Sequence, residues 1–262
     1  MPVLSLVEGK VVAIALNTFW EAVRDRILYA ILIFALLMLA GSTILVTISV
    51  GGEEKIIKDL GLASISIFGT LIAIFLGIAL VSKEIERRTV YTIVSKPIHR
   101  YQFVLGKYLG LVLTLLVNVL VMALGLIGLA YLWEGVSSLR LLLAVLFTFL
   151  ELMLVTALAL FFSTFSSPTL SAMFTICLFV AGHLSPDLRL FAARFGGGLL
   201  RPAAEGLYFL LPNLSRLDFN DQVVRGLRVD GGTMALSFAY AMFYIAALLL
   251  AAMAIFQRRD FK

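Results

Sequence analysis

Long uninterrupted apolar runs are the feature that most limits what this chain can fold into. A helix needs about 20 apolar residues to cross roughly 30 Å of hydrocarbon at about 1.5 Å per residue, and the sequence contains several such runs. Charged residues make up only 14% of the chain, whereas they approach about 25% in soluble domains. Strands of a membrane barrel would instead alternate polar and apolar residues. The sequence therefore predicts an all-α integral membrane protein.

The run lengths predict a single transmembrane domain over residues 1–262, with six membrane-spanning helices. Residues 10–26 carry apolar and charged side chains on opposite faces, which is typical of an amphipathic elbow helix in the membrane interface. Residues 185–230 mix glycines with apolar stretches and predict an extracytoplasmic segment of short helices. The predicted spans cover residues 27–49, 60–81, 103–133, 139–163, 169–183 and 233–256.

The distribution of basic residues predicts that both termini are cytoplasmic. Six Lys and Arg residues lie within residues 82–108, at a short connection between two spans. Short connections rich in these residues stay on the cytoplasmic side of a membrane. We therefore expect a multi-pass protein of the cell inner membrane. Its net charge of +5 then indicates contact with the lipid surface rather than with nucleic acid.

Residues 82–100 form a charged island between two apolar stretches, and here we expect contact with another protein. One face of a short helix would carry side chains suited to a groove in a soluble partner: Glu84, Arg87, Arg88 and Tyr91. Pro97 ends this helix because it disfavours helical geometry at Lys96. The alternative is a solvated loop that only sets the orientation of the chain.

Three motifs at this island resemble a known family. They read Ser-Lys-Glu-Ile-Glu-Arg-Arg-Thr at 82–89, Ser-Lys-Pro-Ile at 95–98 and Leu-Gly-Lys-Tyr-Leu-Gly at 105–110. Together they resemble the cytoplasmic connection between the second and third spans of ATP-binding cassette permeases of the type-2 exporter class. The resemblance implies a six-span permease that pairs with a second permease subunit, identical or different, and with two cytoplasmic ATPase subunits. It implies that the island is the coupling helix to these ATPases, with Glu84, Arg87, Arg88, Tyr91, Lys96 and Pro97 as contact residues.

The chain lacks the features of a nucleotide-binding or metal-binding enzyme. Gly9-Lys10 and Gly106-Lys107 both lack the first glycine and the following Ser or Thr of a phosphate-binding loop. We therefore expect no cofactor and no enzymatic activity in this chain, with ATP and Mg bound by a partner ATPase. His99 and His183 fall on opposite sides of the predicted membrane, so we expect no metal site.

Glu151 is the acidic residue near the middle of a predicted span, where an ionised group costs at least about 2.5–3.5 kcal/mol. It should face protein or water, either as part of a transport pathway or gate or in a hydrogen bond to a neighbouring helix. Asn118 on the third span is a candidate partner and a second pathway residue. A proton carried by Glu151 would suit an ion-coupled secondary transporter, which is the alternative function. An ATPase that copurifies with the chain would separate the two classes.

Two further features concern packing. Gly69, Ala73 and Gly77 are spaced four residues apart on the second span and predict a close helix contact, more readily within this subunit than between subunits. Cys177, the single cysteine, excludes a disulfide within the chain. It lies in an apolar run, and we expect a packed core thiol there.

Overall fold

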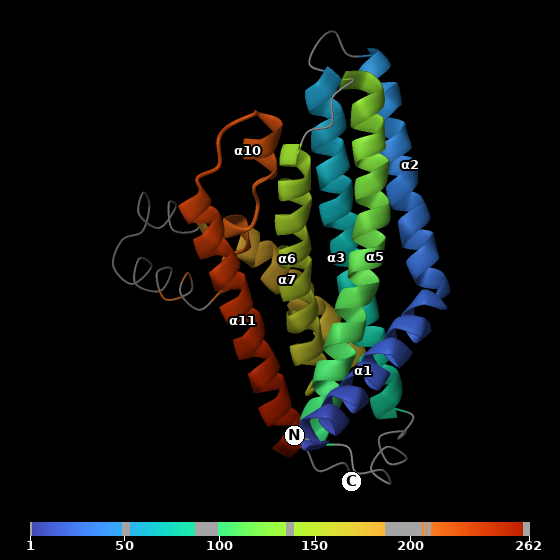
Figure 1. Cartoon of the computed structure of the whole chain (residues 1–262), viewed down its shortest axis with the longest axis vertical. Coiled ribbons are helices and arrows are strands. Elements are labelled where there is room, and N and C mark those ends of the chain that lie inside the picture. The colour runs from blue at the N-terminus through green and yellow to red at the C-terminus, as the bar shows by residue number, and fades with distance from the viewer. Residues whose placement is uncertain are drawn as a thin grey trace.

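The chain folds into long helices that run along a common axis, with one helix lying across an end of the bundle (Figure 1). The computed structural model describes residues 2–48, 53–86, 99–134, 139–186, 206, 208 and 211–258, and these residues contain no strand. The elements are α1 (Pro2–Val23), α2 (Arg26–Ile48), α3 (Glu53–Glu86), α5 (Arg100–Glu134), α6 (Leu139–Ser163), α7 (Pro168–His183), the 3-10 helix η1 (Leu214–Arg216), α10 (Asn220–Val224) and α11 (Gly231–Arg258).

Within the described residues, α2, α3, α5, α6 and α11 are long and apolar enough to cross a membrane. The all-helical class is confirmed, and five of the six predicted spans fall on these helices, apart from residue 49, which lies outside the described residues. The remaining predicted span, residues 169–183, falls on α7. This helix has 16 residues and is about 24 Å long at about 1.5 Å per residue, less than the roughly 30 Å of a bilayer core. α7 alone therefore extends only part of the way across.

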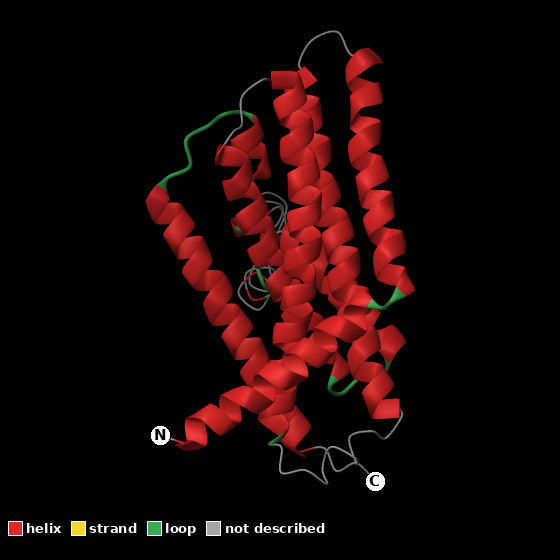
Figure 2. Ribbon diagram, turned by 45° about the vertical axis from the view of Figure 1, so that its right-hand side comes forward, coloured by secondary structure: helices red, strands yellow, loops and turns green. Residues whose placement is uncertain are grey.

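Three helices form the interior of the bundle, and two cover it. The central parts of α3, α5 and α6 are 61%, 50% and 72% buried, whereas those of α2 and α11 are each 22% buried. In Figures 1 and 2, α2 and α11 lie on opposite sides of the inner helices. The outer faces of α2 and α11 are apolar, with Phe34, Leu37, Leu236 and Phe243 all more than half exposed. Such faces suit contact with lipid or with another apolar helix.

Small residues set the close contact between α3 and α6. A Cβ atom added at Gly69 would lie 2.5 Å from Leu152 Cδ1, and one added at Gly77 would lie 3.1 Å from Ala159 Cβ. Both distances are shorter than ordinary van der Waals contact, so a larger side chain at either position would require Leu152 or Ala159 to move. The prediction that this small-residue stripe packs within the subunit is confirmed.

α1 crosses the bundle at the end where α5 begins and α11 finishes, and we call this the α1 end (Figure 2). It packs on α5 at two glycines. A Cβ atom at Gly106 would lie 2.7 Å from Ile14 Cβ, and one at Gly110 would lie 2.5 Å from the carbonyl oxygen of Ala15. The opposite side of α1 carries an exposed apolar row at spacing four: Val12, Leu16 and Trp20.

α7 turns its apolar face outward. Its buried residues are Ser171, Thr175 and Gly182, whereas Met173 and Phe174 are exposed. Cys177 is also exposed, so the prediction of a packed core thiol is wrong. In a membrane helix, small and polar residues face neighbouring helices and apolar residues face lipid, and therefore an apolar run does not by itself locate the protein interior.

Candidate functional site

The α1 end joins the beginning of α5 to the end of α11. Nη1 of Arg100 donates hydrogen bonds to the carbonyl oxygens of Phe256 at 3.1 Å and Gln257 at 3.0 Å. A guanidinium at the C-terminus of a helix satisfies carbonyls that have no partner within the helix, and its charge opposes the helix dipole. The rings of Phe103 and Phe256 stack beneath it with centroids 5.7 Å apart. The last turn of α11 is thus fixed to the first turn of α5.

A contact that forms one half of a capping box marks where α5 begins. The side-chain oxygen of Gln102, 1% exposed, accepts a hydrogen bond from the backbone N–H of His99 at 3.1 Å. The backbone N–H of Gln102 in turn bonds the carbonyl of His99 at 3.0 Å. Both backbone N–H groups, which would otherwise have no acceptor at the start of a helix, thus form hydrogen bonds. α5 therefore has a fixed origin immediately after the charged island.

The structure describes only the edges of that charged island. Glu84 lies in the last turns of α3, which ends at Glu86. Other predicted contact residues lie outside the described residues, namely Arg87, Arg88, Tyr91, Lys96 and Pro97. The predicted roles of all six stay predictions.

A buried lysine connects α1 to α5. The ammonium of Lys107 lies 3.6 Å from Oε2 of Glu21, and the two side chains are 2% and 37% exposed. The ammonium also lies 5.9 Å from the centroid of the Phe103 ring. Lys107 follows Gly106, so the charge contact and the close backbone contact occur on the same turn of α5.

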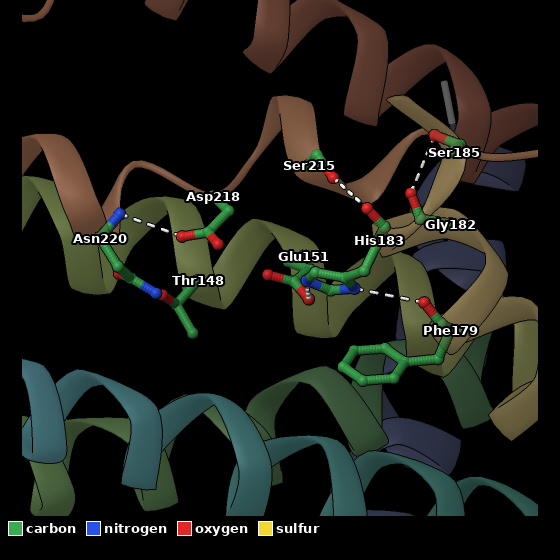
Figure 3. Close-up of polar contacts among 9 residues, drawn as sticks. All are labelled: Thr148, Glu151, Phe179, Gly182, His183, Ser185, Ser215, Asp218 and Asn220. Atoms are coloured by element: carbon green, nitrogen blue, oxygen red, sulfur yellow. Dashed lines mark hydrogen bonds and ion pairs between the residues drawn. The ribbon is translucent and has the colours of Figure 1, made fainter. Parts of the chain in front are cut away.

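A second polar site lies at the centre of α6. Glu151 has twelve residues of α6 on each side and is 2% exposed. Its Oε1 atom lies 3.3 Å from Nε2 of His183 at the end of α7, and the other ring nitrogen, Nδ1, lies 3.2 Å from the carbonyl oxygen of Phe179 (Figure 3). Within the described residues Oε1 accepts no hydrogen bond. The nearby polar group is the imidazole of His183.

The end of α7 is capped, although it stops beside the middle of α6. Its last carbonyls would otherwise lack donors. The backbone N–H of Leu184 bonds the carbonyl of Val180 at 3.0 Å, the hydroxyl of Ser185 donates to the carbonyl of Gly182 at 3.0 Å, and the hydroxyl of Ser215 donates to the carbonyl of His183 at 2.7 Å. These donors allow a helix to end inside the protein.

Residues 211–219, which we call the return segment, lie against the end of α7. A Cβ atom at Gly182 would lie 2.6 Å from the carbonyl oxygen of Pro212 and 2.9 Å from Cγ of Leu214, so this approach requires glycine. Leu214 is fully buried. The return segment thus covers the Glu151–His183 pair on the side of α7 (Figure 3).

The return segment is also tied to α11 and, through the residue that follows it, to α6. The hydroxyl of Tyr240 accepts a hydrogen bond from the backbone N–H of Asn213 at 2.8 Å, and the hydroxyl of Ser237 donates to the carbonyl of Arg216 at 2.9 Å. Asn220, at the start of α10, accepts a hydrogen bond from Thr148 of α6 at 3.5 Å. Three helices therefore converge on this short stretch.

Asn118 does not contact Glu151 among the described residues. Its amide donates to the carbonyl of Thr114, one turn earlier on α5, at 2.8 Å, and its side-chain oxygen has no donor there. The structure thus places His183, rather than Asn118, beside Glu151. Sequence reasoning missed this pair, although α6 and α7 form an antiparallel hairpin that brings residues at similar distances from the 164–167 turn together.

These features define a class: a multi-pass membrane protein with a helical bundle, an interior carboxylate and one end tied together by charged contacts. The family model described as ABC-2 family transporter protein matches residues 12–261. The chain belongs to the ABC-2 family of transporter permeases, as its sequence motifs indicated, and it is a transmembrane transport subunit. Membership implies ABC ATPase partners and a membrane location. No protein of curated function matches the chain.

Proposed function

We propose that this permease is the transmembrane subunit of an ATP-driven exporter of the cell inner membrane, with both termini cytoplasmic. Two permease subunits, identical or different, would form the substrate pathway, and two cytoplasmic ATPases would bind ATP and Mg. α1 would be the interfacial elbow helix. α7 would be part of the sixth crossing.

The hydrogen bonds between Arg100 and the last carbonyls of α11 are the main support for a coupling role of residues 82–100. Residues 82–100 begin within α3 and end at the first residue of α5. Since Arg100 also holds the last turn of α11, a displacement of this segment acts on three spans at once. A coupling helix needs such a connection, and a solvated loop that only sets orientation does not.

Reversing the charges of the island tests the proposal. Glu84→Arg combined with Arg87→Glu should place like charges where a partner groove expects opposite ones, which can cost several kcal/mol in docking. We expect the permease to insert and purify normally but to lose its copurifying ATPase and its ATP-dependent transport. Asp221→Arg combined with Arg225→Asp is the matched control, because it reverses an exposed i,i+4 pair on α10. Full ATPase binding by the Glu84→Arg, Arg87→Glu variant would contradict a coupling role for residues 82–100.

Glu151 and Asn118 are the pathway or gate residues in this proposal. Each has a buried side-chain oxygen without a hydrogen-bond donor among the described residues, and such oxygens are costly unless they serve a ligand or a moving part. Transport measured in sealed vesicles with and without ATP separates this mechanism from an ion-coupled carrier. Uptake driven by a proton gradient without ATP would favour the carrier.

A further inference from the structure

The two oxygens beside the His183 ring limit how many protons the Glu151–His183 pair can hold at low cost. A carbonyl oxygen only accepts, so Nδ1, which lies 3.2 Å from the carbonyl of Phe179, carries a proton. Nε2 then faces the carboxyl of Glu151 at 3.3 Å. The two atoms are close without forming a hydrogen bond in this structure, and their proximity is favourable only if the pair holds one further proton, either on the carboxyl or on the imidazole. Both arrangements leave the pair with no net charge.

Gain or loss of a proton gives the Glu151–His183 pair a net charge. Without the proton, an imidazole lone pair faces a carboxylate, and with a second proton an imidazolium has no carboxylate partner. The first state leaves a charge on the buried Glu151, which is unfavourable unless the surroundings change. The second places the charge on His183, which is partly exposed. His183 is 29% exposed on its side chain and Glu151 is 2% exposed, so protons reach the pair from the His183 side.

Among the residues that the structure describes, few other ionisable groups face the pair. Asp218 of the return segment is close enough to repel a charged Glu151, but it is exposed and accepts a hydrogen bond from the backbone N–H of Asn220 at 3.0 Å. From α5, the hydroxyl of Tyr108 donates to the carbonyl of Met153 at 3.3 Å. From α11, Tyr240 is engaged by the return segment. His183 is thus the partner that decides the charge of Glu151.

The geometry points to a proton-binding site at the centre of the bundle: Glu151 and His183 share one proton, and this shared proton holds the return segment closed over the end of α7. The connection is direct, because the carbonyl of His183 accepts the hydroxyl of Ser215 and Leu214 packs on Gly182. Movement of His183 away from α6 therefore pulls on the return segment. The site goes beyond the proposed export function and does not depend on an ATPase.

Thiol accessibility under the return segment tests this site in the isolated permease. A cysteine replaces the fully buried Leu214 in a Cys177→Ala background, and the labelling rate by a soluble maleimide is divided by that of a cysteine at the exposed Gln222. The ratio cancels the pH dependence of the thiol itself. We expect a low ratio where the pair holds one proton and a rise of about tenfold at alkaline pH, which corresponds to ~1.4 kcal/mol in the opening equilibrium.

Two substitutions of Glu151 test whether the pH dependence of labelling comes from the Glu151–His183 pair. In Glu151→Gln the amide can donate to Nε2 of neutral His183, so the ratio should stay low at the alkaline pH where that of the parent rises. Glu151→Leu offers no such contact and should raise the ratio at every pH. A pH-independent ratio in the parent protein, or a Gln variant that follows the parent curve, would overturn the proposal. If the Leu variant does not fold, the comparison of parent and Gln variant still decides.

Discussion

Buried charges in this permease have partners on other helices, and each pair joins two elements. Lys107 joins α5 to α1 through Glu21, and Glu151 joins α6 to α7 through His183. In each pair one side chain is 2% exposed and the other is partly exposed, but the buried member is the lysine in the first pair and the carboxyl in the second, with Glu21 37% and His183 29% exposed. Loss of one partner therefore has consequences that depend on which partner is removed.

The Lys107–Glu21 pair should respond asymmetrically to substitution. Glu21→Gln removes a carboxylate beside the buried ammonium and should lower stability by about 1–3 kcal/mol, below the ~3–5 kcal/mol of a fully buried pair because Glu21 is partly in solvent. Lys107→Met keeps the volume and removes the charge, so its cost should be smaller. Thermal unfolding of the purified permease measures both. An equal loss in the two variants would show that packing, rather than charge, dominates this contact.

The residues that carry chemistry could be predicted from the sequence only in part. Glu151 stands out because it is acidic in the middle of an apolar run. Its neighbour could not be selected in the same way, since His183 lies near the end of a predicted span and the depth at which α7 ends depends on how its hairpin with α6 packs. Lys107 was recognised within a motif, but its burial depends on the position of α1.

Helices in this bundle meet closely where glycine faces a neighbour. Periodicity and run length were sufficient to predict α2, α3, α5, α6 and α11, because a membrane span must be long and apolar. The length of α7 was also visible, but its termination inside the bundle depends on caps supplied by Ser185 and by the distant Ser215. Such long-range caps leave no local sequence signal.

The contact between α1 and α5 provides a test at the level of elements. Gly110→Val would place Cβ 2.5 Å from the carbonyl oxygen of Ala15, and α1 would have to shift, at a cost of about 1–3 kcal/mol for overpacking. Gly128→Val is the matched control on the same helix, because nothing lies within 4 Å of the added Cβ atom there. Comparison of thermal midpoints and of protease cleavage within α1 should show a loss for Gly110→Val alone. Equal thermal midpoints and equal cleavage in the two variants would argue against the close packing of α1 on α5.

The whole molecule has two distinct ends. The α1 end contains α1, the first residue of α5 and the last turn of α11, while the return segment reaches the middle of α6 from α10 and α11 (Figure 1). In the proposed function, the α1 end would receive force from the ATPases, while the return segment lies at a distance from that end. Charge asymmetry predicts which end is cytoplasmic, and side-specific labelling determines it.

Membrane-impermeant labelling of single cysteines checks the orientation of the whole chain. In a Cys177→Ala background, cysteines at Gly52 and Asp221 should react from outside the cell, whereas a cysteine at His99 should react only after permeabilisation. The background substitution matters because Cys177 is exposed in the structure. Reaction at position 99 from outside would reverse the topology and remove the coupling role of residues 82–100.

The shortness of α7 also bears on biosynthesis. Its 16 residues fall below the roughly 20 that insert readily as an independent span, and only the turn at residues 164–167 separates it from α6. We therefore expect α6 and α7 to leave the translocon as one hairpin. Glu151 is synthesised 32 residues before His183. We therefore expect its carboxyl to stay out of contact with lipid until His183 has been synthesised.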